Sequence, residues 1–155
     1  MIDNKKLLQI KHHFPSYCKY VYPKYIFGEH LIKIMRALTD IDGGKLDRLI
    51  LNLPPRAGKS LTVSQLFPSW YLTKNPDKRI IFATYESDFA SSFGAKVRDN
   101  IKEHSELGIK VDNRSSRKDE FEIKNHLGGY KSSGVGSSIT GRGANVTIVD
   151  DPIKN

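Results

Sequence analysis

The chain has 155 residues, of which 38% are hydrophobic and 27% are charged, so it is globular in composition and not disordered. Its net charge of +8 favours a polyanionic partner, most simply nucleic acid, although a soluble basic surface explains the charge equally well. Cys18 is the single cysteine, which excludes an internal disulfide, and we expect a packed thiol in a reducing cytoplasm. The sequence contains no apolar run of membrane-spanning length, so no membrane partner is expected.

The first half of the chain predicts two helices and one strand. Residues 1–28 are rich in tyrosine, lysine and proline and predict an irregular or partly helical lead-in. Residues 29–40 carry apolar side chains at helical spacing, which predicts a helix. The apolar run 47–53 predicts a buried strand that ends at two prolines. Residues 61–70 suit a second helix, which Pro68 is expected to kink or to end in part.

The next elements are a second strand and a long helix. Residues 79–85 are apolar and predict a buried strand. Apolar side chains then recur every four residues, which predicts a helix with Ser87 or Asp88 as its N-cap. Residues 109–133 are polar with short alternations of apolar side chains, and we expect a small antiparallel excursion there.

The last elements complete the order of an α/β domain. Glycine and serine dominate residues 132–145, which predicts a loop, and residues 146–152 predict a third buried strand that ends in two aspartates. Strands that alternate with helices in this way predict an α/β layered fold with a mainly parallel sheet. Because ligands of such sheets bind beyond the carboxyl ends of the strands, "PPRAGKS" and "DDP" both occupy candidate positions.

The stretch "LILNLPPRAGKSLTV" is similar to a phosphate-binding loop, although Leu53 stands where the general pattern has its first glycine. In such a loop Gly58 lets the backbone approach a phosphate, Lys59 reaches the β- and γ-phosphates, and the Ser60 hydroxyl binds Mg²⁺. The Gly-Lys-Ser triplet alone is weak support, whereas its place between a strand and a helix is stronger. The residues expected to bind the nucleotide are Pro55, Arg56, Ala57, Gly58, Lys59, Ser60 and Leu61.

Asp150 supplies the second half of the candidate site. It follows four apolar or β-branched residues, and a carboxylate at the tip of a parallel strand can hold the Mg²⁺ of a bound nucleotide. A solvated turn at the end of a strand is the alternative for Asp150 and Asp151. Since two motifs placed together reinforce each other, we expect ATP and Mg²⁺ as cofactors, with Ser60 and Asp150 as metal ligands.

The combination of "PPRAGKS", "ITGRGAN" and "IVDDPIKN" resembles the N-terminal ATPase domain of tailed-phage terminase large subunits. The resemblance extends over residues 25–155 and also includes "GEHLIKIMRAL" and "RIIFATYESDFASSFGAKVRD". It implies a P-loop NTPase-like fold in which ATP hydrolysis powers the translocation of viral DNA into proheads. We expect residues 29–155 to form a partial P-loop ATPase domain, incomplete at its C-terminal end, after a lead-in of residues 1–28, and we expect no nuclease domain.

The resemblance also implies partners and roles for single residues. The expected partners are double-stranded DNA, a homo-oligomeric ring, the terminase small subunit and the portal, in the host cytoplasm. Terminase loops often lack the first glycine, and Arg56 adds a second cation beside the phosphates. Asp151 stands where many terminases have a catalytic glutamate. Arg142 is either an arginine finger for a neighbouring subunit or a loop residue that touches DNA or nothing. The expected catalytic residues are therefore Lys59, Arg56, Asp151 and Arg142.

The sequence leaves the adenine site and the class of motor open. Tyr25, Phe27 and His30 precede the loop, and one of their rings can stack on adenine or pack in the core. Ser87 follows another strand end without an assigned role. The alternatives to a terminase are another P-loop ATPase of the helicase or loader kind, and a non-enzymatic basic module that binds DNA.

Overall fold

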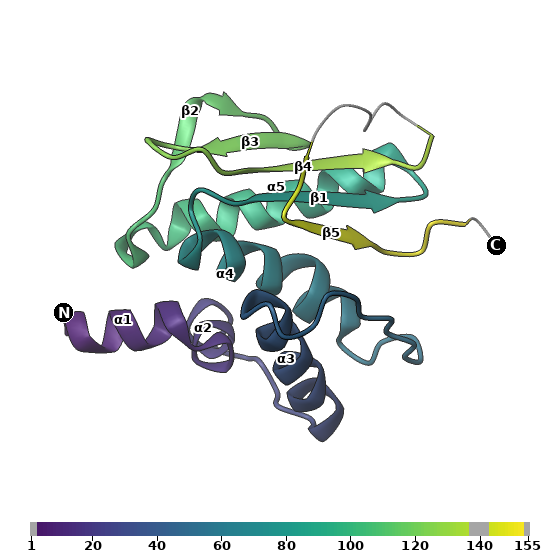
Figure 1. The fold of residues 1–155 in the computed structure, drawn as a ribbon, viewed down its shortest axis with the longest axis horizontal. Helices are drawn as coiled ribbons and strands as arrows, with labels where there is room; N and C mark the ends of the chain where they lie inside the picture. The colour runs from purple at the N-terminus through teal and green to yellow at the C-terminus, as the bar shows by residue number, and fades with distance from the viewer. Residues whose placement is uncertain (1–2, 137–142, 154–155) are drawn as a thin grey trace.

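A five-stranded sheet forms the upper layer of the computed structural model, which describes residues 3–136 and 143–153 (Figure 1). Its strand order is β2-β3-β4-β1-β5. Two pairings, β4–β1 and β1–β5, are parallel, and the other two, β2–β3 and β3–β4, are antiparallel. The strands are β1 (Arg79–Thr84), β2 (Val111–Ser116), β3 (Glu120–Ile123), β4 (Gly129–Gly134) and β5 (Val146–Val149). The α/β class is confirmed, but the predicted mainly parallel sheet is wrong. The sheet is mixed, because the predicted antiparallel excursion pairs with its parallel centre.

Helices cover one face of this sheet in two layers (Figure 1). The long helix α5 packs on β1 and β4, and α4 contacts α5. The N-terminal helices α1 and α2 contact α4 in turn. The helical elements are α1 (Asn4–His12), α2 (Phe14–Val21), α3 (Glu29–Asp42), the π-helix η1 (Ser60–Leu66), α4 (Phe67–Lys74), α5 (Ser87–Glu103) and the 3₁₀-helix η2 (Ser105–Leu107). Within the described residues, none of these helices has the length and apolar character needed to cross a membrane.

The lead-in contributes side chains to the same hydrophobic core as the sheet. Phe14 stacks at a tilt on Trp70 with ring centroids 4.9 Å apart, and both side chains are buried. Cys18 is also buried, and burial raises the pKa of its thiol, as expected for a packed cysteine. The predicted partly helical character of residues 1–28 is confirmed by α1 and α2.

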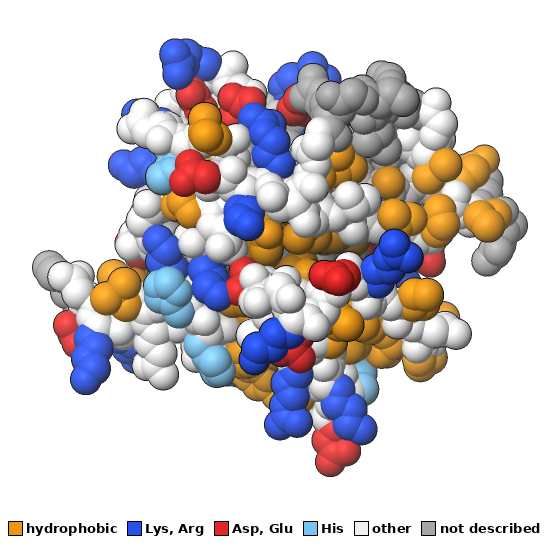
Figure 2. Space-filling model, in the orientation of Figure 1, with side chains coloured by type: hydrophobic (Ala, Val, Ile, Leu, Met, Phe, Trp, Pro, Cys, Tyr) orange, Lys and Arg blue, Asp and Glu red, His pale blue; other side chains and the backbone are white. Residues whose placement is uncertain are grey.

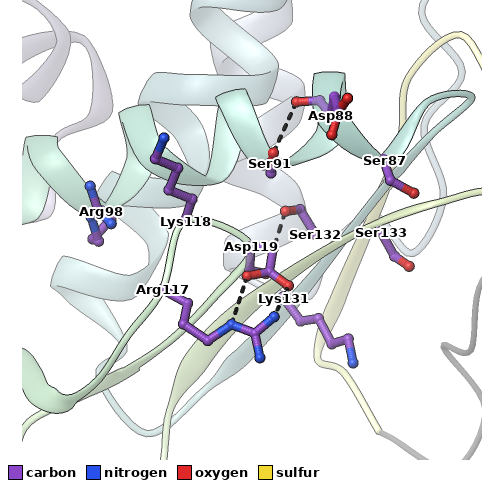
Figure 3. Close-up of a pocket in the computed structure, with 10 residues that line it drawn as sticks. All are labelled: Ser87, Asp88, Ser91, Arg98, Arg117, Lys118, Asp119, Lys131, Ser132 and Ser133. Carbon is purple, nitrogen blue, oxygen red and sulfur yellow. Dashed lines mark hydrogen bonds and ion pairs between the residues drawn. The ribbon is translucent and has the colours of Figure 1, made fainter.

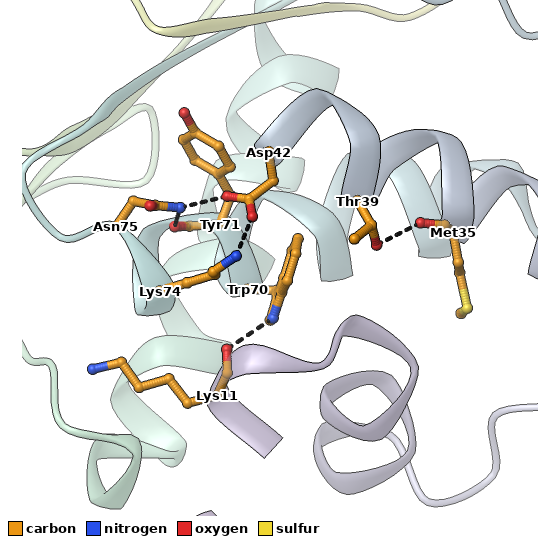
Figure 4. A network of polar contacts seen from close by, with 8 residues as sticks. All are labelled: Lys11, Met35, Thr39, Asp42, Trp70, Tyr71, Lys74 and Asn75. Carbon is orange, nitrogen blue, oxygen red and sulfur yellow. Dashed lines mark hydrogen bonds and ion pairs between the residues drawn. The ribbon is translucent and has the colours of Figure 1, made fainter. Parts of the chain in front are cut away.

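A polar network ties three helices together beneath the core (Figure 4). The nearly buried carboxylate of Asp42, at the end of α3, pairs with Lys74 of α4 and accepts a hydrogen bond of 2.7 Å from Nδ2 of Asn75. The indole N–H of Trp70 donates to the carbonyl oxygen of Lys11 over 3.0 Å, which joins α4 to α1. The network therefore joins α4 both to the end of α3 and to α1.

The prediction of a strand at residues 47–53 is wrong, because in the described residues this segment belongs to no strand of the sheet. Leu49, Leu51 and Leu53 pack against the core while Ile50 is 95% exposed, so the segment keeps the alternation of a strand. In the described part of the chain, however, no ladder joins it to β5. A cavity of about 480 Å³, lined by residues on both segments, separates the two. Periodicity predicted which side chains face inward, but a strand also requires a backbone partner at bonding distance.

The prediction of a loop at residues 132–145 is wrong for its first three residues, because they belong to strand β4 (Gly129–Gly134). This segment is a central strand between β1 and β3 despite its glycines and serines. A Cβ atom on Gly129 would lie 2.7 Å from the carbonyl oxygen of Phe121, so the neighbouring strand leaves no room for a side chain. Glycine here allows close packing of backbones, which composition alone does not distinguish from a turn.

One helix boundary differs in detail from the prediction, and a second agrees with it. Glu86 is the N-cap of α5 and makes no side-chain cap bond, so neither Ser87 nor Asp88 has the predicted role. The helix after the loop changes from π to α winding at Phe67, directly before Pro68. Since proline has no backbone N–H to donate, the expected break beside Pro68 is confirmed.

Candidate phosphate-binding site

The loop between residues 53 and 60 is held in a tight conformation by α3. Gly58 has a φ of +84° and Arg56 a φ of +61°, so the backbone turns twice through the left-handed region. Nε2 of His30 donates a hydrogen bond to the carbonyl oxygen of Ala57 over 2.9 Å. A Cβ on Gly58 would lie 3.2 Å from a methyl carbon of Leu31. The glycine at position 58 is therefore required both by its φ and by the packing of α3.

A cavity of about 490 Å³ lies over this loop. Its walls include all seven residues expected to bind the nucleotide, together with three neighbours: Leu53, Pro54, Pro55, Arg56, Ala57, Gly58, Lys59, Ser60, Leu61 and Asp151. The loop and the acidic strand end, which are about ninety residues apart in the sequence, thus form one site. The predicted juxtaposition of "PPRAGKS" and "DDP" is present in the structure.

Lys59 is the residue that joins the two halves of the site. Its Nζ lies 3.0 Å from a carboxylate oxygen of Asp150 and 3.6 Å from one of Asp151. The hydrogen bond that Lys59 donates to Asp150 raises the pKa of the Lys59 ammonium, so Lys59 is charged at neutral pH. The two carboxylates differ in burial, since the side chain of Asp150 is 7% exposed and that of Asp151 is 80% exposed.

Backbone bonds extend the parallel pairing through both aspartates. The amide of Asp150 donates to the carbonyl oxygen of Ala83 over 2.9 Å, and the amide of Tyr85 donates to that of Asp151 over 3.3 Å. Asp151 then turns with a φ of +42°, a conformation that aspartate tolerates better than most residues. The sheet therefore buries the first carboxylate and exposes the second.

Ser64 is a site residue that sequence reasoning missed. Its Oγ donates a hydrogen bond of 3.0 Å to the second carboxylate oxygen of Asp150, and both side chains are buried. Lys59 and Ser64 together occupy both oxygens of this carboxylate. The available signal was spacing, because Ser64 lies four residues after Ser60 and thus one turn along the same helix face.

We expect Ser64→Ala to lower the free energy of unfolding by about 1–2 kcal/mol, because a buried carboxylate loses one of its donors. Ser92→Ala is the matched control, since the exposed Ser92 hydroxyl bonds only to a carbonyl oxygen within its own helix. Urea unfolding followed by circular dichroism measures both variants. Equal stabilities of Ser64→Ala and the control would show that this hydrogen bond does not hold Asp150.

The remaining predicted residues divide into those at the site and those away from it. Arg56 lines the loop cavity and also a second cavity of about 350 Å³ beside it. Ser87 lines a groove between α5 and β4, apart from the loop. Arg142 lies outside the described residues, and its role stays a prediction.

The three adenine candidates have different positions. Tyr25 and His30 line the second cavity, and Phe27 packs against the ring of Tyr25 at a centroid distance of 5.1 Å. The Tyr25 hydroxyl lies 2.6 Å from Oγ1 of Thr62, and its side chain is buried, so Tyr25 belongs to the core. His30 is occupied by its bond to the loop. This cavity is also lined by Arg56 and Gly58 of the loop.

These observations define an α/β domain with a lysine-bearing loop and a buried carboxylate at the carboxyl ends of its parallel strands. Residues 50–155 match the family described as terminase large subunit, T4likevirus-type, N-terminal, and the chain belongs to this family. The resemblance stated from the sequence is thereby confirmed, and it places the chain in phage DNA packaging. No curated protein and no solved structure matches the chain.

Proposed function

We propose that this chain binds ATP and Mg²⁺ at the phosphate-binding loop, as part of the motor subunit that drives viral DNA into proheads. The observation that carries the proposal is the position of Lys59, whose ammonium lies at the loop cavity between the carboxylates of Asp150 and Asp151. Family membership supports the packaging role, and the parallel centre β4-β1-β5 supports a P-loop NTPase-like fold.

The charges of Lys59, Asp150 and Asp151 lie close together, and their arrangement suggests how a nucleotide would fit. Lys59 neutralises the nearly buried Asp150, so phosphates that attract Lys59 would leave a carboxylate in need of a cation. Asp150 and the Ser60 hydroxyl offer the hard oxygen ligands that Mg²⁺ prefers. Bound Mg²⁺ would neutralise the charge that develops during phosphoryl transfer.

The other predicted residues take supporting roles in this proposal. Asp151 is exposed beside Lys59, so its carboxylate is free to orient an attacking water molecule. Arg56 lines the cavity and adds positive charge for the phosphates. Arg142 is proposed to act on a neighbouring subunit of a homo-oligomeric ring. Double-stranded DNA, the small subunit and the portal are the proposed partners, as in the family.

The adjacent aspartates provide a matched pair of variants that tests the metal role. We expect Asp150→Asn to weaken the Mg²⁺-dependent part of ATP binding about tenfold, because one charge-assisted ligand is lost. Asp151→Asn should keep the affinity within about twofold, since an exposed carboxylate beside the loop contributes little to binding. Calorimetric titration of ATP, with and without Mg²⁺, compares the two proteins. The metal assignment is wrong if both variants show the same Mg²⁺ dependence as the unchanged chain.

A further inference from the structure

A groove beside α5 and β4 lies apart from the phosphate-binding loop. It has a volume of about 700 Å³ and is bounded by α5, the turn between β2 and β3, and the second half of β4 (Figure 3). Its lining comprises four lysine or arginine side chains, four serines and two aspartates. None of these residues lines the loop cavity, so the groove is a separate site.

Two of the four cations are held in place by neighbouring carboxylates. Arg117 forms a bidentate pair with Asp119, with distances of 3.0 and 2.7 Å. Arg98 bonds to Asp99 and donates to the carbonyl oxygen of Ser116 over 3.1 Å. Their guanidinium groups are therefore ordered before any ligand arrives, while each keeps further N–H groups for a ligand.

Lys118 and Lys131 supply charge that no carboxylate balances. Neither ammonium group has an ion-pair partner among residues 3–136 and 143–153. Lys118 extends along α5 toward the side that carries Arg98, and Lys131 points away from the Arg117–Asp119 pair (Figure 3). Further along α5, Lys102 bonds to the Ser116 hydroxyl over 3.0 Å, so positive charge continues beyond the groove. Basic side chains also lie on the sheet edge over β2 and β3 (Figure 2).

The groove also contains the neutral donors that accompany lysine and arginine at phosphates. Ser87 and Ser91 lie in the first turns of α5, whose N-terminus carries a partial positive charge. Ser132 points toward α5 from β4, while Ser133 points away from it (Figure 3). The Ser91 hydroxyl donates to the carbonyl oxygen of Asp88, and the Ser132 hydroxyl donates to that of Asp119. Lysine, arginine, serine and helix N-termini are the groups that bind the sugar–phosphate backbone of DNA. Cations spaced along an open groove fit a chain of phosphates better than a single small anion, which requires donors that converge on one point.

We propose that this groove binds the phosphate backbone of double-stranded DNA. The proposal rests on the proposed function in one respect, because it gives the DNA partner of a packaging motor a position on this chain. The site is distinct from the nucleotide site, so DNA binding here does not require Lys59 or Asp150. Its contacts are to phosphates, and binding is therefore independent of base sequence and sensitive to salt.

The test compares Lys118→Ala/Lys131→Ala with the control Lys5→Ala/Lys6→Ala, which removes the same charge from exposed positions on α1. Fluorescence anisotropy of a short labelled duplex, measured at several salt concentrations, gives the affinity and its salt dependence. The groove variant should bind more weakly, and the slope of log K against log salt should fall by about 1.8, since two phosphate contacts are lost. The control should match the unchanged chain.

Two outcomes would overturn the proposal: an equal loss in both variants, which indicates only net charge, or no loss in the groove variant. Loss of binding to polyglutamate with unchanged DNA binding would also overturn it, in favour of an acidic protein partner. Mg²⁺-dependent ATP binding, measured on the same variants, should be unaffected. If ATP binding fails in the unchanged chain, the proposed function fails, while the DNA measurements still decide the groove.

Discussion

Replacing Lys59 by alanine is expected to weaken ATP binding about 10- to 100-fold, because the phosphates lose a charge-assisted hydrogen bond of about 1.5–3 kcal/mol. The same change should destabilise the ligand-free protein. Asp150 is nearly buried and its Oδ1 lies 3.0 Å from Lys59 Nζ, so the variant leaves a buried charge with only Ser64 as a side-chain partner. We expect the free energy of unfolding to fall by about 1–3 kcal/mol.

Lys33→Ala is the control for this prediction, since Lys33 is exposed on α3 and carries the same charge. Calorimetric titration of Mg·ATP measures affinity, and chemical unfolding measures stability. Asp150 raises the pKa of Lys59, so the stability linked to the Lys59 proton is fully present at pH values just below the ordinary lysine pKa and is lost as pH rises through the raised pKa of the folded protein. The stability difference should therefore persist at neutral pH. A variant that binds Mg·ATP as tightly as the control would refute the role of Lys59.

Gly94→Ala is expected to destabilise the protein by about 3 kcal/mol, although helix propensity alone predicts a gain of about 1 kcal/mol for this change. A Cβ at position 94 would lie 2.1 Å from the carbonyl oxygen of Lys118 and 3.0 Å from Oγ of Ser132. The first of these is a backbone atom, which cannot rotate away as a side chain can. Helix α5 would have to move off the β2–β3 turn that borders the DNA groove.

The sign of this effect separates packing from propensity. Gly143→Ala is the control, because a Cβ there would meet nothing within 4 Å and its φ is not in the left-handed region. Thermal and urea unfolding of both variants give the comparison. If Gly94→Ala proves more stable than the unchanged chain, α5 does not approach the turn as closely as the structure has it.

The sequence alone predicted both parts of the candidate site, the loop and the aspartate at the strand end, because each is recognised from the residues directly beside it in the chain. The loop around Gly58 and Lys59 lies between an apolar run and a helix, and Asp150 follows a short apolar strand. Both positions are fixed by the chemistry of neighbouring residues, and parallel pairing of β1 with β5 brings Asp150 to the open end of the sheet. The bond from Ser64 was not predictable in the same way, because it depends on the winding of η1 and on the burial of Asp150.

The errors in the fold arose where pairing with distant segments decides the structure. Residues 47–53 have the alternation of a strand, but alternation does not state whether a partner backbone lies within reach. The segment Gly129–Gly134 has the composition of a loop, yet it is a central strand because its glycines admit close neighbours. In both cases the tertiary environment overrides local propensity, which is a weak guide for strands.

A structure of the chain with Mg²⁺ and a non-hydrolysable ATP analogue would decide whether the loop is a nucleotide site. In the ligand-free protein, Nζ of Lys59 bonds to Asp150 and also lies near Asp151. With nucleotide bound, we predict that this ammonium leaves Asp150 for the β- and γ-phosphates, and that Mg²⁺ lies beside Asp150 and the Ser60 hydroxyl. An analogue bound elsewhere, with the Lys59–Asp150 ion pair intact, would contradict the proposed site.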